Sequence, residues 1–201
     1  MKDELSKGER TRKSIIDAAH QLFIKQGYHG TSIRQISEKA NITLGGIYNH
    51  FSSKDDLFEA VIIEYHPVYY VIPNLQSISG DSIEDYIRHA GHVMHDHLSQ
   101  RDDFFNLLFI EIVEFKGRHF PKLFSKVFPI AVSFTDSISK KKGYLRKIPK
   151  HAMVVCFVGM ILASYLFQKM LITHNVQSFP SINIDSILDI FLHGIIEKNP
   201  D

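Results

Sequence analysis

The sequence is poor in cysteine, in charge of one sign and in low-complexity segments. Its 201 residues include one cysteine, Cys156, which excludes an internal disulfide bond. Lys and Arg number 23 against 22 Asp and Glu, so the overall charge does not indicate a particular partner. The chain does not open with the charged, apolar and cleavage-site series of a signal peptide. These observations predict an ordered protein in a reducing cytoplasm.

Hydrophobic residues make up 44% of the chain, enough for one small module and one helical body with a core. Residues 152–167 carry no charge. This stretch is shorter than the ~20 residues that cross a bilayer, and Gly159, Ala163 and Ser164 are small. We therefore expect no membrane span but a buried helix, which must be covered on every side because it is apolar all round.

Residues 31–57 carry helix-capping signals at close intervals. Ser32, followed three residues later by a glutamine, forms the pattern of a capping box. Asn41 tolerates the left-handed conformation that ends a helix, and Thr43 and Ser53 can each cap a following helix. Two short helices joined by a tight turn predict a helix-turn-helix, in which the second helix enters the major groove of DNA.

Apolar residues at helical spacing support the same interpretation. They are Ile15, Ala19, Leu22 and Phe23 in a first helix, Ile33, Ile36 and Ala40 in a second, Leu44, Ile47 and Phe51 in a third, and Leu57, Phe58, Val61 and Ile62 in a fourth. Basic and acidic residues are nearly balanced through residue 60, so the prediction of DNA binding rests on the motif and not on the charge. Arg10, Arg12 and Lys13 nevertheless open the first helix with no acid between them.

The ordered set of motifs resembles the tetracycline-repressor (TetR) family of bacterial regulators. It consists of Ile15 and Ala18-Ala19, Leu22-Phe23, Gly27-Tyr28, Thr31-Ser32, Ile33 with Ile36, Gly46-Ile47-Tyr48-Asn49-His50-Phe51, and Lys54 with Leu57. A weaker similarity follows at His119-Phe120-Pro121 and Gly143-Tyr144-Leu145-Arg146. The resemblance implies an all-α fold of about nine helices. A three-helix DNA-binding domain would occupy residues 1–55, and an effector-binding and dimerisation domain residues 56–201.

Position in the third helix predicts which residues approach bases. Thr43, Leu44, Gly45 and Gly46 should face the groove, and Asn49 should reach a base edge or a phosphate. Leu44 can contact a thymine methyl group, and the glycine pair permits close approach of the backbone. These residues supply few hydrogen-bonding groups, so Arg34, Thr43 and DNA shape are expected to carry much of the specificity.

Phosphate contacts are implied by the resemblance. Residues matching Tyr48, His50 and Lys54 bind phosphates in the family, and Arg34 matches a position that reaches a base or a phosphate. Ser32 and the amides beside it suit a phosphate at a helix N-terminus. Two alternatives stay open, because Tyr48 could be a core aromatic and Lys54 a solvated first-turn lysine.

Further helices follow to the end of the chain. The fourth should continue through Pro67 and end at Pro73, and Asp81 with Glu84 should cap the next. Its apolar face would consist of Ile83, Ile87, Ala90, Met94 and Leu98. The remaining patterns are a short apolar helix at 104–114, a helix from Pro121 to Gly143 bent at Pro129, a helix from Pro149 to about Leu171, and a last one carrying Ile184, Ile187, Leu188, Phe191 and Ile195.

The resemblance also implies a ligand and a second copy. The two C-terminal helices would pair with their copies, and a dimer supplies the two-fold symmetry of a palindromic operator. A small, largely apolar effector would bind in the body and release the DNA, with Pro67 as a joint. The candidate pocket residues are His66, Tyr69, Tyr86, His97, Phe105, Phe109, Met160 and Tyr165, although aromatic and Met residues at such spacing also suit a plain core.

Other functions find less support. The histidines His89, His92, His95 and His97 do not share one helical face, so no metal site and no cofactor are predicted. Cys156 suits inert filler in an apolar helix. Phosphate-loop, nucleophile-elbow, HExxH and paired-carboxylate patterns are missing, which argues against an enzyme. The sequence therefore predicts a homodimeric transcriptional repressor, with a ligand-responsive activator and, less favoured, a small-molecule-processing enzyme as alternatives.

Overall fold

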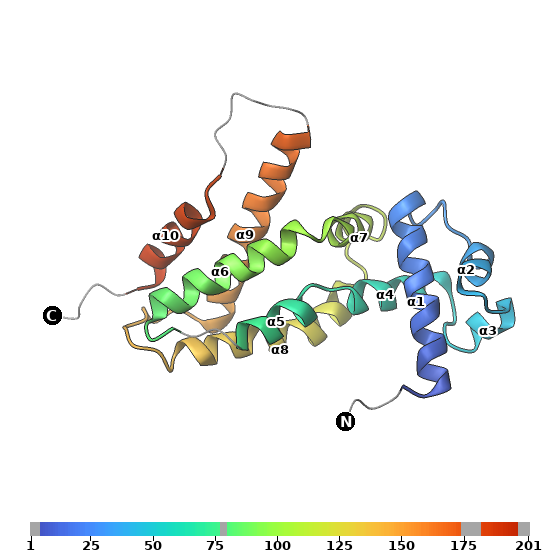
Figure 1. The fold of residues 1–201 in the computed structure, drawn as a ribbon, viewed down its shortest axis with the longest axis horizontal. Helices are drawn as coiled ribbons and strands as arrows, with labels where there is room; N and C mark the ends of the chain where they lie inside the picture. Colours follow the sequence, from blue (N-terminus) through green and yellow to red (C-terminus); the bar gives the residue numbers. More distant parts are fainter. Residues whose placement is uncertain (1–4, 77–79, 174–181, 197–201) are drawn as a thin grey trace. The chain divides into compact units, whose positions relative to one another are not determined.

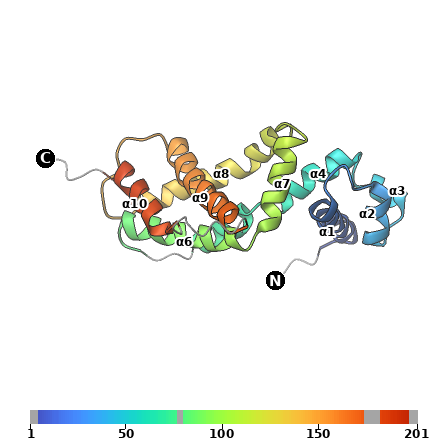
Figure 2. The same ribbon diagram turned by 90° about the horizontal axis from the view of Figure 1, so that it is seen from above.

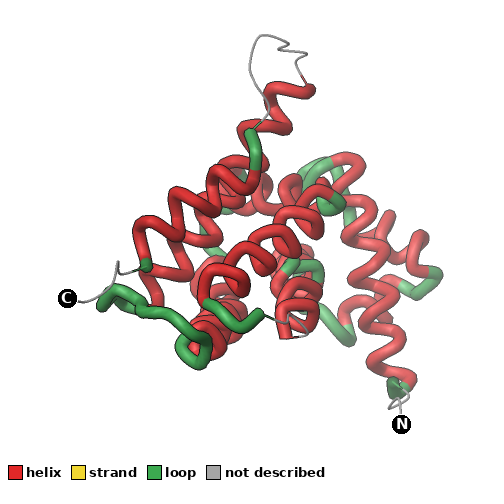
Figure 3. The backbone as a smooth tube through the Cα atoms, turned by 60° about the vertical axis from the view of Figure 1, so that its left-hand side comes forward, coloured by secondary structure: helices red, strands yellow, loops and turns green. Residues whose placement is uncertain are grey.

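The structure is a computed structural model that describes residues 5–76, 80–173 and 182–196. Within these ranges every regular element is an α-helix, as Figure 3 shows, which confirms the all-α fold. The helices are α1 (Lys7–Gln26), α2 (Ile33–Ala40), α3 (Leu44–Tyr48), α4 (Lys54–Glu64), α5 (Val68–Gln76), α6 (Ile83–Ser99), α7 (Asp102–Val113), α8 (Phe120–Ile138), α9 (Lys150–Thr173) and α10 (Ile184–Ile195) (Figure 1).

The described chain forms two compact units. Unit 1 contains the described residues up to His66 together with residues 103–124, and unit 2 contains the described residues of 67–102 and of the chain from 125 onward. The predicted domain boundary at residue 55 falls inside unit 1, where α4 packs against α1. Unit 1 thus adds α4 and most of α7 to the three helices that the sequence assigns to DNA binding.

Side-chain caps fix the helix ends in the helix-turn-helix. The Ser32 hydroxyl accepts from the Gln35 amide at 3.2 Å, and the Gln35 side chain accepts from the Ser32 amide at 2.8 Å, so the capping box is present. Asn41 ends α2 in the left-handed conformation with φ 55°. Thr43 caps α3 and Ser53 caps α4, each accepting from an amide three residues on. All four predicted signals are confirmed.

Aromatic side chains fill the core of unit 1. The ring of Phe58 on α4 lies 5.4 Å from that of Phe23 on α1 and 4.8 Å from that of Phe115 after α7. Tyr28, in the turn after α1, meets Phe115 edge-on at 4.6 Å. The aliphatic part of this core includes Ile15, Ile16, Ala19, Ile36, Ile47, Leu57, Val61 and Ile62. Most of the predicted apolar positions are therefore core residues.

Two prolines lie differently from prediction. Pro67, expected inside the fourth helix, lies between α4 and α5, and its carbonyl accepts from the amides of Tyr70 and Val71 at 2.9 Å each. A proline at a helix start costs little, because the first amides of a helix have no intrahelical partner. Pro73, expected to end a helix, lies inside α5, which continues to Gln76. The chain thus passes from unit 1 to unit 2 at Pro67 without one continuous helix.

In unit 2, α6 contacts α5, α9 and α10 (Figure 1 and Figure 2). Its cap is Ser82 and not the predicted Asp81, since the Ser82 hydroxyl accepts from the Asp85 amide at 3.0 Å. A Cβ atom added to Gly91 would lie 2.3 Å from Leu188 Cδ2, so α10 lies directly against α6 at this residue. The predicted apolar face is buried at Ile83, Ile87, Ala90, Met94 and Leu98.

The helix starts at two further prolines are as predicted, but one helix end is not. Pro121 lies in the first turn of α8, and α9 begins directly after Pro149. Pro129 lies inside α8. The helix ends at Ile138, well before Gly143, because the segment between them turns back to pair the Lys142 amide with the Asp81 carbonyl at 2.9 Å.

The long helix α9 buries only one face in the single chain. Met153, Val154, Phe157, Ile161 and Tyr165 are buried. The opposite side is exposed and uncharged, and we call it the α9 stripe: Val155, Cys156, Gly159, Ala163, Phe167 and Met170. The expectation that this helix is covered on every side is therefore wrong for the single chain, and so is the view of Cys156 as filler. Its 24 residues are long and apolar enough to cross a membrane by length and composition.

Candidate nucleic-acid interface

Helix α3 turns two large side chains toward solvent. Leu44 is 46% exposed and Tyr48 53% exposed, whereas Ile47 between them is fully buried and Phe51 after the helix is 2% exposed. The prediction that Leu44 points inward together with Ile47 is therefore wrong. The exposure of Leu44 suits a contact with a DNA groove. Exposure also excludes the alternative in which Tyr48 is a core aromatic.

The two glycines of α3 differ in their surroundings. A Cβ atom added to Gly45 would meet no atom within 4 Å, so packing within the protein does not require a glycine at this position. A Cβ atom added to Gly46 would lie 2.7 Å from Ile42 Cγ2 and 3.2 Å from Thr43 Oγ1. Gly46 is thus required by packing under the helix cap, while Gly45 leaves the start of α3 open to an approaching surface.

Arg12 adds a positive charge beside the end of α3. Its guanidinium carbon lies 5.0 Å from the centre of the Phe51 ring, within the range of a cation–π contact. Phe51 directly follows His50, one of the residues implied to bind phosphate. The sequence signals this residue only through the cluster Arg10, Arg12 and Lys13, and it does not indicate the contact with Phe51.

Lys54 ties α4 to the turn that precedes α2. Its ammonium donates to the carbonyls of Tyr28 and Thr31 at 2.8 Å each and lies 4.1 Å from the centre of the Tyr28 ring. Burial lowers the pKa of Lys54, and the nearby carboxylate of Glu114 opposes that shift. Lys54 is therefore not a solvated lysine, and an ammonium has one further donor for a phosphate.

The other predicted DNA residues lie on the same part of unit 1. Ser32 is exposed at the N-terminus of α2, and Asn49 is exposed at the C-terminus of α3. Arg34 is exposed and forms a 3.1 Å ion pair with Glu38 one turn later, a bond that a phosphate can replace. The ten predicted residues thus come from α2, α3, the segment between α3 and α4, and the first turn of α4, where phosphate and base contacts can be made together.

The predicted effector residues are divided between the two units. Unit 1 holds His66, Phe105 and Phe109, and unit 2 holds Tyr69, Tyr86, His97, Met160 and Tyr165. Phe105 is buried, but Phe109 and Tyr69 are exposed. The Nε2 atom of His97 lies 3.1 Å from the Asn74 side-chain amide.

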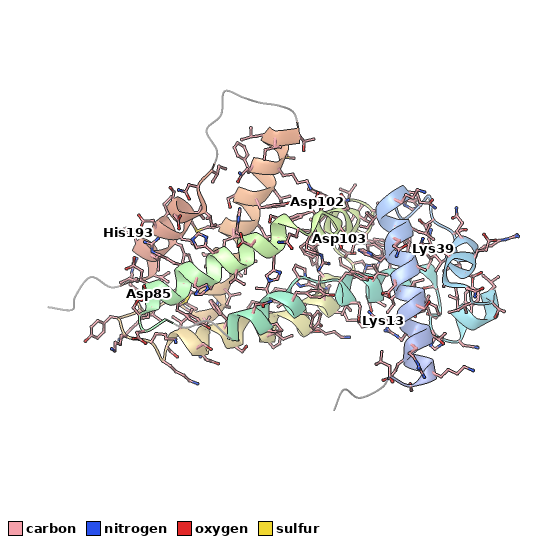
Figure 4. The ribbon with its side chains drawn as sticks, viewed as in Figure 1. Lys13, Lys39, Asp85, Asp102, Asp103 and His193 are labelled. Carbon is pink, nitrogen blue, oxygen red and sulfur yellow. The ribbon has the colours of Figure 1, made fainter. Side chains whose placement is uncertain are left out.

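Tyr165 lies in a polar contact of unit 2. Its hydroxyl donates at 2.8 Å to Asp102, which stands at the start of α7 in Figure 4. Burial, reinforced by the Asp102 hydrogen bond and charge, raises the pKa of Tyr165 to about 12. Hydrogen bonds from Lys169 and Tyr165 lower the pKa of Asp102. The phenol is thus an anchored core group.

A small apolar cavity lies between α6, α8, α9 and α10. It is lined by Ile87, Phe134, Thr135, Ile138, Met153, Val154, Phe157 and Phe191, and none of the eight predicted residues is among them. Its volume of about 10 Å³ is room for roughly one water molecule. Tyr86, Phe134, Phe157 and Phe191 form a ladder of neighbouring rings with centroid spacings of 5.3, 5.8 and 5.2 Å.

Known proteins resemble the chain in two different ways. Residues 15–61 match the model of the bacterial regulatory proteins of the tetR family. An uncharacterised HTH-type transcriptional regulator of Bacillus subtilis (strain 168), YvkB, is 34% identical over 106 residues, which is 53% of this chain and 54% of YvkB. Residues 15–61 of this chain are thus similar to the helix-turn-helix region of TetR-family regulators. Since the match spans about half of YvkB, it does not extend to the activity of the whole protein.

Two solved structures share the fold over nearly the full length. A structure from Shewanella sp. PV-4 assigned to the tetR family is 17% identical with a TM-score of 0.68, covering 94% of this chain and 99% of its own. The regulator FadR from Bacillus subtilis, solved in complex with stearoyl-CoA, is 17% identical with a TM-score of 0.63, covering 91% and 98%. The body outside the helix-turn-helix thus has the fold of these regulators.

Proposed function

We propose that the protein is a cytoplasmic homodimer that represses transcription by binding a palindromic operator and that a small, largely apolar effector releases it. The exposed helix α3 carries this proposal. It offers Leu44 and Tyr48 to solvent, keeps Gly45 free of contacts, and stands beside Ser32 at the N-terminus of α2. A helix N-terminus and flanking polar residues suit phosphates, and the start of α3 suits base edges.

Selection against random double-stranded DNA tests the DNA-binding proposal. The wild-type protein should enrich a palindrome, and a Tyr48→Ala/His50→Ala variant should not, because both substitutions leave the buried core untouched. Far-UV circular dichroism of the variant controls for folding. If the wild type enriches no sequence at low salt, the proposed function is wrong. Binding should also weaken roughly 10³–10⁵-fold between 50 and 200 mM salt if ~6–10 phosphates are contacted.

The α9 stripe supports pairing with a second copy. Val155, Gly159, Ala163 and Phe167 follow one another at intervals of four residues, the spacing that forms one ridge of a helix. Gly159 has no atom within 4 Å of an added Cβ, so a second helix can approach closely. An uncharged exposed stripe of this length is unfavourable in water and is stabilised when a copy of the same helix covers it.

A charge on the stripe tests this pairing. Val155→Arg should shift the protein from dimer to monomer in analytical ultracentrifugation and abolish binding to a full palindrome. Tyr144→Arg is the matched control, because Tyr144 is a similarly exposed apolar residue outside the stripe. A dimer that survives Val155→Arg unchanged would show that the copies pair elsewhere or not at all.

The aromatic ladder supports an apolar effector. Three of its rings, Phe134, Phe157 and Phe191, line the small cavity, and a ligand that separates them would replace aromatic contacts by contacts with its own chain. The B. subtilis FadR complex makes acyl-CoA thioesters the first probes. Stearoyl-CoA should raise the unfolding midpoint and release operator DNA, whereas coenzyme A without an acyl chain should do neither. Release requires tighter binding to the DNA-free state, since equal affinity for both states shifts nothing.

A further inference from the structure

The junction between α7 and α8 holds a buried histidine between two carboxylates. Glu111 is fully buried and His119 is 4% exposed. Glu111 Oε2 lies 2.7 Å from His119 Nδ1, and Glu111 Oε1 accepts from the His119 backbone amide at 2.7 Å. On the other side of the ring, His119 Nε2 lies 3.3 Å from Asp55 Oδ2. We call these three side chains the α4 latch, because Asp55 belongs to the first turn of α4.

The backbone of the junction fixes the ring in this place. Lys116 and Gly117 both have positive φ, 53° and 77°, and the Gly117 amide donates to the Glu111 carbonyl at 3.0 Å. The chain thereby doubles back so that His119 faces Glu111. A Cβ atom on Gly117 would lie 2.9 Å from the Phe120 ring, so the turn depends on glycine there.

The latch closes fully only when the imidazole carries two protons. A neutral imidazole has one N–H, and an N–H at Nδ1 satisfies Glu111 but leaves the Nε2 lone pair opposite a carboxylate oxygen of Asp55. An imidazolium donates to both carboxylates, and hydrogen bonds between ionised partners are about twice as strong as neutral ones. The proton at Nε2 therefore decides whether His119 holds α4.

Other charged groups near the ring give Asp55 an alternative. Arg118 lies 3.2 Å from Asp55 Oδ1 but is 63% exposed, so its hold on Asp55 is weak in water. Lys122 on α8 pairs with Glu59 on α4, and Glu114 follows α7 near His29 at 3.3 Å. The rings of Phe58 and Phe115 cover His119 at 5.7 and 4.7 Å.

A chain of contacts leads from the latch to the helix-turn-helix. Asp55 is preceded by Lys54, whose ammonium is bound to the carbonyls of Tyr28 and Thr31. Thr31 is followed by Ser32, the cap of α2 and a predicted phosphate contact. When the first turn of α4 is held, the N-terminus of α2 is already ordered for a phosphate. When it is loose, DNA binding must order it at an entropic cost.

We infer that His119 is a positioning residue for operator binding, which in its doubly protonated form holds α4 through Asp55 and makes operator affinity depend on pH. The inference rests on the proposed DNA-binding function. Affinity should be highest on the acidic side, where the imidazolium is formed, and should fall by roughly tenfold toward the alkaline side, within the usual range of coupling between two sites.

The pH profile of operator binding tests the latch. The full-length wild type, His119→Gln and His92→Gln are titrated with the selected operator by fluorescence anisotropy at intervals from about pH 6 to about pH 8.5. Gln fills much of the ring's space and keeps one hydrogen-bonding arm without titrating. His92 is a partly exposed histidine of unit 2 that pairs with Asp185, and His50 stays in every protein, so its contribution is common to all.

The wild type and His92→Gln should lose affinity as the pH rises, and His119→Gln should lack the roughly tenfold part of this loss that is due to His119. Calorimetry in buffers of different ionisation enthalpy should show proton uptake on DNA binding that His119→Gln lacks. If His119→Gln fails to fold, Asp55→Asn takes its place, because it removes the partly exposed acceptor charge and should flatten the profile equally. If the variant keeps the wild-type pH dependence of affinity and the wild-type proton uptake, the inference about His119 is wrong, while the proposed DNA-binding function still stands. If no protein binds DNA at any pH, the proposed function fails and the inference with it.

Discussion

The contrast between the two glycines of α3 gives a sharp prediction for single substitutions. Ala is favoured over Gly in a helix by about 1 kcal/mol. Gly45→Ala adds a methyl group where no atom lies within 4 Å, so it should raise the free energy of unfolding by up to about 1 kcal/mol. For a chain of this size, that corresponds to about 2–4 °C in the unfolding midpoint.

Gly46→Ala should act in the opposite direction. Its methyl group would stand 2.7 Å from Ile42 Cγ2 and 3.2 Å from Thr43 Oγ1, the atom that caps α3 by accepting from the Gly46 amide. Overpacking costs typically 1–3 kcal/mol, which exceeds the gain in helix propensity. We expect a net loss of about 1 kcal/mol. Ile42 is half-buried, so its side chain has limited room to move.

The two variants should rank in the opposite order for operator affinity and for stability. Gly45→Ala is expected to be the more stable protein and yet to bind the selected operator at least tenfold more weakly, because its methyl group separates α3 from the groove floor. Thermal unfolding and fluorescence anisotropy with the same operator measure the two quantities. Wild-type affinity in Gly45→Ala would refute the close-approach argument, and equal stability of the two variants would refute the packing argument for Gly46.

Further predictions concern the cores and the tie at Lys54. Gly91→Ala should lower the free energy of unfolding by about 1–3 kcal/mol, because its methyl group meets Leu188, whereas Gly8→Ala in α1, which has no atom within 4 Å of the added methyl group, should not; urea denaturation compares them. Tyr165 has a pKa of about 12 in the fold against about 10 for an ordinary tyrosine, so its stabilisation is complete below about pH 10 and is lost as the pH rises through about 12. Tyr165→Phe should lack this alkaline loss in unfolding midpoints measured across that window. Lys54→Met leaves the part-buried Thr31 carbonyl without its ammonium donor and the Tyr28 carbonyl with only the Thr31 amide, and it should cost about 1–3 kcal/mol in the same denaturation assay.

Local chemistry made much of the helix-turn-helix predictable. The capping hydroxyl of Ser32, the left-handed Asn41 and the cap at Thr43 act within four residues, so their effect can be inferred from the sequence alone. The same kind of inference chose Asp81 where Ser82 caps α6, because neighbouring residues offer equivalent side chains. Pro67 shows a different limit, since a proline suits a helix start as well as a kink and only tertiary packing decides.

The long-range contacts of the site were not predictable in this way. Lys54 meets carbonyls 26 and 23 residues earlier, and His119 meets Asp55 64 residues earlier. No periodicity encodes such pairs. The family motif does include Lys54 and His119-Phe120-Pro121, but it does not indicate which contacts Lys54 and His119 make. The exposed α9 stripe was missed for a related reason, because composition measures how apolar a helix is and not which of its sides a neighbour covers.

The single thiol on the exposed side of α9 is a native attachment site for a spectroscopic probe. Because Cys156 is the only cysteine in the sequence and is exposed in the single chain, one small maleimide dye or nitroxide attaches at one defined place before the copies pair, without any engineered substitution. Fluorescence self-quenching or electron–electron dipolar spectroscopy would then give the distance between two copies directly. The same reagent, if bulky, would itself keep the copies apart, so labelling yield against protein concentration becomes a measure of association.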